Sequence, residues 1–329
     1  MSKIDFVVTW VDGQDPIWLE ERAKFDSNID LKKDINDASR YRDLDFFKYW
    51  FRAVEKYAPW VNKIFFVTYG HLPEWLETSN PKLVVVKHTD FIPKEYLPTY
   101  NSNVIELNLH RISDLGEQFV LFNDDMFLNK HVEKSDFFIE GLPKDFGIYK
   151  PILPDSDFAH TLVNNTMIIN KYFGAKETFR KNRWKFFNKA YSKYNLHNIF
   201  SLFYKGIVGY HNAHVSLSHL KSTFNTVWDK EFDRLHEVCL HKFRTKDELN
   251  HWLMSNWNIE SNLFYPQQFS FGKTYPMEDL ASIEKELINH ISNVICINDS
   301  SDVKDFESSS EFICRLFEKS LPEKSSFEI

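Results

Sequence analysis

Residues 4–16 read IDFVVTWVDGQDP, and this stretch decides the fold. Seven of its first eight residues are apolar or β-branched, and it ends in an acid, a glycine, a second acid and a proline. Such a pattern predicts a buried strand that runs into a tight loop. Because ligands bind at the carboxyl ends of strands in open α/β sheets, Asp12 and Asp15 in this loop are candidate functional acids. Asp15 has a second interpretation, since an acid before Pro16 can be the N-cap of a helix.

Three more apolar runs, at 63–69, 83–87 and 118–122, predict three further buried strands. With the helical spacing between them, the order is strand, helix, strand, strand, helix, strand. This order predicts an α/β fold with a mostly parallel sheet flanked by helices. The run at 118–122 leads directly into Asn123, Asp124 and Asp125. The topology therefore predicts that these acids gather at the same rim of the sheet as the acids of the first loop.

The rest of the chain adds helices and one late strand. Residues 155–260 are predicted to be mostly helical and to form an insertion or lid between sheet elements. A short strand is predicted at 294–297, where VICI runs into Asn298 and Asp299. No composition shift marks a domain boundary, so residues 1–329 are predicted to form a single catalytic domain.

Composition and missing motifs exclude several classes of protein. The net charge of −7 argues against nucleic acid as a partner. Three cysteines without a CxxC spacing indicate a reducing compartment, and we expect a cytoplasmic protein. We see no signal peptide and no apolar run of about 18 residues that could span a membrane. The motifs GxGxxG, GxxxxGK[ST], GxSxG and HExxH are absent, so dinucleotide, P-loop, esterase and zincin functions have no support.

Two groups of side chains are candidates for phosphate chemistry. Asp124 and Asp125 at a strand end suit a divalent ion that neutralises a diphosphate, although Asn-Asp pairs also favour ordinary turns. His211 and His214 form an HxxH pair that could bind zinc, supply a general base or be structural. Arg244 is either a surface cation or a group that stabilises charge on a phosphoryl group.

Residues 171–205 hold nine lysines and arginines against one acid, Glu177. Aromatic residues, among them Trp184, recur between the cations. One interpretation is an amphipathic helix with a solvated positive face. The alternative is contact with an anionic membrane surface or with a polyanionic acceptor.

Four stretches of the chain resemble the four sequence blocks of the Stealth family. The first is IDFVVTWVDGQDP. The second includes RYRDLDFFKYWFRAVEKYAPWVNKIFFVTYGHLPEWL and LPTYNSNVIELNLHRISDLGEQFVLFNDDMFL. HNAHVSLSHL through HKFRTKDELNHW is similar to the third block, and VICINDSSD with the terminal LPEKSSFE to the fourth. The third block departs from the usual His-x-Pro-His, because HNAH lacks the proline.

The resemblance implies a glycosyltransferase-A-like, Rossmann-like fold and a sugar-phosphate transferase. The donor would be a nucleotide-diphosphate sugar, a UDP-sugar. The enzyme would move sugar-1-phosphate to a hydroxyl of an acceptor glycan or lipid-linked oligosaccharide, form a phosphodiester and release UMP, in capsule or surface-polysaccharide synthesis at the inner face of the membrane. The alternatives are an ordinary glycosyltransferase that releases UDP and a non-catalytic protein that binds a sugar or nucleotide.

The resemblance also implies roles for individual residues at matching positions. His211 would be the base for the acceptor hydroxyl, Arg244 would stabilise the transition-state oxygens and Asn298 would position the phosphoryl group. Mg²⁺, or Mn²⁺, would be held by Asp124, Asp125 and Asp299. The donor would be bound by Trp10, Asp12, Asp15, Arg42, Asn101 and Asn103.

Overall fold

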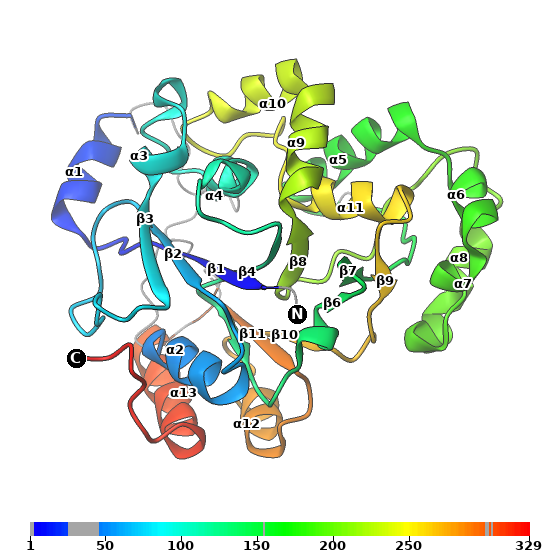
Figure 1. Cartoon of the computed structure of the whole chain (residues 1–329). Coiled ribbons are helices and arrows are strands. Elements are labelled where there is room, and N and C mark those ends of the chain that lie inside the picture. The colour runs from blue at the N-terminus through cyan, green and yellow to red at the C-terminus, as the bar shows by residue number, and fades with distance from the viewer. Residues whose placement is uncertain (1–2, 26–45, 154, 300–302, 304) are drawn as a thin grey trace.

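The computed structural model of the chain describes residues 3–25, 46–153, 155–299, 303 and 305–329. Within these residues the main sheet has five strands in the order β3-β2-β1-β4-β8 (Figure 1). Their bounds are Asp5–Trp10 for β1, Ile64–Thr68 for β2, Leu83–Lys87 for β3, Gln118–Asn123 for β4 and Leu217–Leu220 for β8. The first four run parallel, and β8 pairs antiparallel with β4. The predicted α/β fold with a mostly parallel sheet flanked by helices is therefore confirmed.

Strand β1 lies between β2 and β4, which explains why its sequence is almost continuously apolar. Successive side chains of a strand point to opposite faces of the sheet. Phe6 and Val8 accordingly pack in one hydrophobic core, while Val7 packs in another. The register places Val7 opposite Phe65 of β2 and Leu121 of β4. One strand thus joins the two cores.

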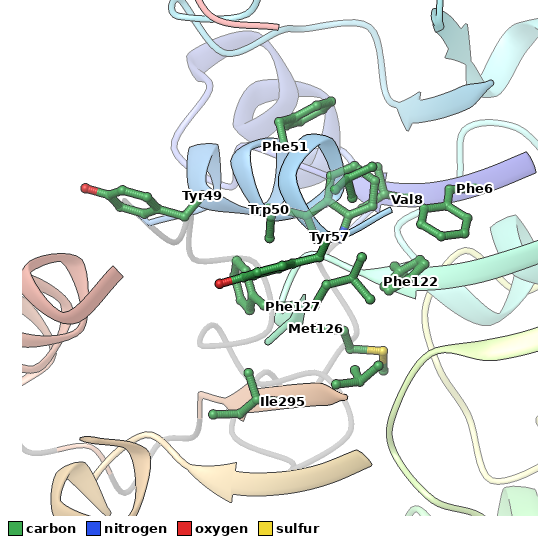
Figure 2. Packing of buried hydrophobic residues seen from close by; sticks show 14 of the residues in the cluster. Phe6, Val8, Tyr49, Trp50, Phe51, Tyr57, Phe122, Met126, Phe127 and Ile295 are labelled. Carbon is green, nitrogen blue, oxygen red and sulfur yellow. The ribbon is translucent and has the colours of Figure 1, made fainter. Parts of the chain in front are cut away.

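The core around Phe6 is completed by helix α2 (Lys48–Tyr57) and a second sheet. In the described residues this sheet has the order β10-β11-β5, with β5 at Met126–Leu128, β10 at Gly272–Pro276 and β11 at Val294–Asn298. Helices α12 (Leu280–Asn289) and α13 (Phe306–Ser320) add to the same core. Trp50 of α2 meets Phe122 with 5.5 Å between ring centroids. Figure 2 shows side chains of α2, β1, β5 and β11 in this cluster.

Helices cover the opposite face of the main sheet, where the core around Val7 lies. Those contributing buried residues include α3 (His88–Phe91), α4 (Ser102–Leu107), α5 (Ala159–Tyr172), α9 (Lys221–Lys230), α10 (Phe232–Cys239) and α11 (Trp252–Glu260). Helix α1 (Pro16–Ala23) packs separately, through Trp18 against Tyr100 and Phe243. The 3₁₀ helices lie at Lys94–Tyr96, Leu109–Arg111, Lys134–Asp136 and Lys189–Tyr194.

The segment 155–260 is rich in helices, and it also supplies strand β8 to the main sheet. Its helices α6 (Ala175–Lys181), α7 (Arg183–Phe186) and α8 (Asn195–Ser201) lie together at the edge of the molecule that is farthest from α1 in Figure 1. A small sheet lies next to them, formed by β6 (Phe138–Ile139), β7 (Leu142–Asp145) and β9 (Tyr265–Pro266). The segment is therefore tied into the main sheet through β8.

A buried arginine on α2 ties the C-terminal residues to this core. The Arg52 guanidinium donates two hydrogen bonds of 2.9 Å to the carboxylate of Glu328, and it also donates to Glu318 at 3.1 Å. The Glu328 side chain is only 3% exposed. Removing the cation would leave this carboxylate buried without its partner, which costs several kcal/mol.

We expect Arg52→Leu to lower the free energy of unfolding by about 3–5 kcal/mol, measured by chemical denaturation. The exposed Lys324→Met, which removes another cation near this end of the chain, is the control and should change it by less than about 0.5 kcal/mol. A loss below about 1 kcal/mol in Arg52→Leu would show that the pair contributes no more than a surface ion pair.

Candidate active site

A cavity of about 500 Å³ opens where β1, β4 and β11 end. Each strand places polar residues there because the chain leaves the sheet at that point. Strand β1 contributes Trp10, and β4 is followed by Asp124 and Asp125. Strand β11 contributes Asn298 and the following Asp299. The acids after β4 thus lie at the carboxyl end of the main sheet as predicted, and they meet Asp299 from the second sheet there.

Asp124 and Asp125 form the turn between β4 and β5, where the chain passes from the main sheet to the second sheet. The Ile297 amide donates to the Asp125 carbonyl at 2.8 Å, so β11 lies directly beside this turn. The turn interpretation of the pair is confirmed, and because the turn faces the cavity, binding of a divalent ion by the two acids stays a prediction. The turn also brings the acids after β4 close to Asn298 and Asp299.

The side chain of Asp125 is held from two directions. Its Oδ2 lies 3.3 Å from Nε2 of His214 and accepts a hydrogen bond from the Cys296 thiol at 3.2 Å. Burial, with the nearby Asp125 carboxylate, raises the pKa of the Cys296 thiol well above its ordinary value, so the sulfur keeps its proton and acts as a donor. The other oxygen, Oδ1, is buried and has no hydrogen-bond partner among the described residues.

This arrangement fits a hard divalent cation better than zinc. Ligand atoms of Asp125, His214 and Cys296 lie within 4.8 Å of one another, but a zinc ligand must be a thiolate, and this thiol is engaged as a donor. Carboxylate oxygens suit Mg²⁺ or Mn²⁺. The buried Oδ1 of Asp125 is one available ligand atom. Asp124 and Asp299 line the same cavity and could supply others.

A cation and a buried acid form another wall of the cavity. Arg244 donates to the Ser102 hydroxyl at 2.5 Å, at the first residue of α4. One turn further along α4, burial raises the pKa of Glu106 to about 7, although Arg244 and His214 oppose the shift. The Nε2 atom of His251 lies 3.7 Å from the Glu106 carboxylate. Burial lowers the pKa of His251 well below its ordinary value, so this imidazole is neutral at pH 7.

The two histidines of the HxxH pair go to different places. His214 lines the cavity beside Asp125. His211 is not among the lining residues, because its ring packs against aromatic side chains. Its ring centroid lies 4.9 Å from that of Phe269 and 5.5 Å from that of Phe146. Burial lowers the pKa of His211 to about 4. The structure therefore brings His214, and not His211, to the other candidate residues, and the pair does not form a shared zinc site.

Asp12 and Asp15 do not line the cavity, contrary to expectation. In the loop after β1, both carboxylates accept hydrogen bonds from backbone amides of the same segment. Asp12 accepts a hydrogen bond from the Gln14 amide at 2.8 Å. Asp15 accepts from the Trp18 amide at 2.7 Å and is the N-cap of α1. The capping interpretation of Asp15 is thus confirmed.

The two predicted asparagines are drawn into a structural contact. Asn101 is fully buried and is the N-cap of α4, and it does not line the cavity. Asn103 does line it. The side-chain amides of both residues donate to one oxygen of the buried Glu248, at 2.9 and 3.1 Å. Arg42 lies outside the described residues.

Comparison with known proteins identifies the family. Residues 2–30 match Stealth protein CR1, conserved region 1, and residues 40–145 match Stealth protein CR2, conserved region 2. A capsular polysaccharide phosphotransferase WcwK of Streptococcus pneumoniae is 52% identical over 328 residues, covering 100% of this chain and 99% of that protein. The chain belongs to the Stealth family. It is an enzyme of the phosphotransferase class, as its full-length relatives are.

Other relatives of this Stealth chain carry related names. Exopolysaccharide phosphotransferase cps2G of Lactiplantibacillus plantarum is 39% identical, over 99% of this chain and 96% of that protein. Receptor polysaccharide phosphotransferase WefC of Streptococcus oralis is 40% identical over the full length of both. A solved galactosyltransferase, LgtC in complex with donor and acceptor sugar analogs, matches with a TM-score of 0.38 at 10% identity, over 98% of each chain, which is too weak a likeness to support any conclusion.

The Stealth cavity draws on the whole chain. Trp10, Asn103, Glu106, Asp124 and Asp125 come from the two matched conserved regions, while His214, Arg244, Asn298 and Asp299 come from later residues. Among the described residues, no helix has both the length and the apolar character needed to cross a membrane.

Glu106 is a lining residue that sequence reasoning did not select. The available signal was its position on α4, three residues after Asn103, which places both on one face of the helix. Its burial and the cations near it depend on segments far away in the sequence, so no local pattern indicated its altered pKa.

We expect Glu106→Gln to change the pH dependence of stability. Because the folded state raises this pKa from 4.5 to about 7, the folded wild-type chain is favoured while Glu106 is protonated and loses stability as pH rises from 4.5 through 7. The variant has no such loss. Its free energy of unfolding should match the wild type near pH 4 and exceed it by about 2–3 kcal/mol above pH 7.

Denaturation at several pH values measures this difference. The exposed Glu74→Gln, which makes the same exchange of a carboxyl for an amide at the surface, is the control. A constant difference in Glu106→Gln would show that the carboxyl titrates normally.

Proposed function

We propose that this Stealth enzyme transfers sugar-1-phosphate from a nucleotide-diphosphate sugar, a UDP-sugar, to a hydroxyl of an acceptor glycan and releases UMP. The acceptor is a glycan or lipid-linked oligosaccharide of capsule or surface-polysaccharide synthesis, as the names of the relatives suggest. The observation that carries the proposal is the meeting of several carboxylates, the Arg244 guanidinium and the His214 imidazole in a single cavity. Phosphoryl transfer depends mainly on positioning and charge neutralisation, and these groups supply both.

The reaction forms one bond and breaks one. The acceptor hydroxyl oxygen attacks the phosphorus that carries the sugar, and the bond from this phosphorus to the bridging oxygen of the nucleotide breaks. The hydroxyl proton passes to a base, and the nucleotide leaves as its monophosphate. The sugar keeps its anomeric configuration because its C–O bond stays intact.

We assign the base to His214. Its Nε2 faces the Asp125 carboxylate at 3.3 Å, so a proton on Nε2 leaves Nδ1 as the basic nitrogen. The carboxylate orients the ring and stabilises the imidazolium that forms when the proton arrives. About 37% of the His214 side chain is exposed, which leaves it open to an acceptor. This assignment replaces His211, which is also partly exposed but packs its ring against Phe146 and Phe269 and does not line the cavity.

Arg244 stabilises the negative charge that grows on the phosphoryl oxygens. Its guanidinium presents a planar fork suited to phosphate, and the contact with Ser102 holds that fork at the cavity wall. Asn298 offers an amide that can position the same group. Mg²⁺, or Mn²⁺, held by Asp124, Asp125 and Asp299, would neutralise the diphosphate when bound. Trp10 and Asn103 would contact the donor from the β1 side of the cavity.

The identity of the nucleotide released tests this function. We expect the purified protein, given Mg²⁺, an acceptor and a panel of UDP-sugars, to release UMP, and we expect Arg244→Gln to slow this release by about 10²–10³-fold. The substitution Arg315→Gln, at an exposed position on α13, is the control and should leave the rate unchanged. Release of UDP would indicate an ordinary glycosyltransferase, and donor binding without turnover would indicate a binding protein.

The HxxH pair supplies a matched test of the base. We expect His214→Gln to lower the rate of UMP release by about 10²–10⁴-fold, because no other group replaces the imidazole beside Asp125. The neighbouring substitution His211→Gln should lower it by less than about tenfold. Circular dichroism establishes that both variants fold. The reverse order of the two rates would return the catalytic role to His211.

We also propose that the enzyme works in the cytoplasm, at the inner face of the membrane. The chain has three cysteines without a CxxC spacing, which suits a reducing compartment. Contact with the membrane is proposed from the positive stretch 171–205. One correction applies to that stretch: Lys185 is 5% exposed, and its ammonium donates to the carbonyl of Asn262 at 2.7 Å, so it is not a docking residue.

A further inference from the structure

Helix α8 and the turn after it have the reverse of the usual amphipathic pattern. The apolar side chains that recur at i, i+3, i+4, i+7 and i+8 point to solvent. Their exposed fractions are 55% for Leu196, 44% for Ile199, 62% for Phe200, 82% for Phe203 and 48% for Tyr204. We call these five residues the α8 stripe. A surface helix normally turns such a stripe to the core.

The polar side of α8 is buried instead, and specific hydrogen bonds fix it there. Asn198 is fully buried, and its side chain accepts from the Tyr149 amide at 2.8 Å. The side-chain amide nitrogen of Asn198 donates to the carbonyls of Gly147 and Phe186, at 2.7 and 2.6 Å. Rotating α8 to bury the stripe would break all three bonds and leave buried backbone groups without partners. The outward orientation is therefore built into the fold.

The sequence around the α8 stripe carries positive charge and no negative charge. No Asp or Glu occurs between Glu177 and Asp229. Lys189, Lys193 and Lys205, which flank the stripe in sequence, are all exposed. Surfaces that bind the interface of anionic bilayers combine exposed apolar side chains with exposed cations.

We propose that the α8 stripe docks the enzyme on an anionic phospholipid bilayer. The apolar side chains of the stripe enter the boundary between headgroups and acyl chains, and the flanking lysines contact lipid phosphates. Helix α8 is seven residues long, so it lies in the interface and does not span the bilayer. Its place beside α6 and α7 at the edge of the molecule leaves it accessible to a flat surface (Figure 1).

Charge favours a lipid surface over a second copy of this chain. A two-fold contact would place the same patch of each copy face to face. The lysines near the stripe would then oppose one another, and the acid-free sequence around them offers no counter-charge. This inference deepens the membrane contact proposed above and rests on it, and its test is separate from catalysis, because flotation measures binding to lipid whereas UMP release measures the reaction.

Flotation of the full chain with vesicles tests the proposal. We expect binding to vesicles of phosphatidylcholine mixed with phosphatidylglycerol, and little binding to phosphatidylcholine alone. The triple variant Leu196→Gln, Phe200→Gln and Phe203→Gln should weaken binding to the mixed vesicles by about tenfold or more, because each side chain loses its transfer into the apolar layer. The single variant Phe203→Gln, at a position 82% exposed, should weaken it in the same direction without any effect on folding.

The matched control is Ile17→Gln with Ile288→Gln, which removes two exposed apolar side chains from α1 and α12 and should leave binding unchanged. Equal binding of the stripe variants and the wild type would overturn the proposal, as would equal binding to neutral and mixed vesicles. Light scattering tests whether the stripe instead binds a second copy of this chain. If the wild type were a dimer and the triple variant a monomer, the stripe would be a dimer contact and the proposal would be wrong.

Discussion

The hydrogen bond from the Ile297 amide to the Asp125 carbonyl holds the turn between the main sheet and the second sheet beside strand β11. Strand β4 belongs to the main sheet and β5 to the second sheet, so the chain must cross between them within two residues. Pairing with β11 fixes that crossing in place. The polar residues after β4 and after β11 then face the same cavity, and the carboxylate of Asp125 meets His214 from a third segment. Without this junction, nothing would hold the acids after β4 beside the acid after β11.

Around this junction, burial keeps several titratable groups in defined protonation states. The Cys296 thiol stays protonated and donates to Asp125. Burial lowers the pKa of His219 to about 3, and His251 beside it is likewise kept neutral. His251 lines the same cavity as Arg244, and as a neutral imidazole it adds no competing positive charge there. The guanidinium is thus left as a fixed cation where an anionic donor would bind.

The sheet could be predicted from the sequence because buried parallel strands are continuous apolar runs, and four such runs occur in the first 125 residues. The position of the acids after β4 at the carboxyl end of the sheet was also predictable from topology, whereas Asp299 after β11 was expected at the site only from the resemblance to the family. The position of the acids after β1 was not predictable, because Asp15 caps a helix that starts at once. Neither was the choice between His211 and His214. It depends on Phe269 and Phe146, aromatic residues far away in the sequence that enclose one ring and leave the other beside Asp125. Local pattern identifies strand ends, whereas packing decides which side chain at those ends is available.

The contact between Arg52 and Glu328 has a consequence for biosynthesis. The two residues are separated by 276 positions. Helix α2 emerges early during translation, yet Glu328 is made only after all of the residues that line the cavity. The core that α2 shares with Ile313, Leu316 and Phe327 can likewise be completed only after these residues are made. The final packing of α2 is therefore a late event of synthesis.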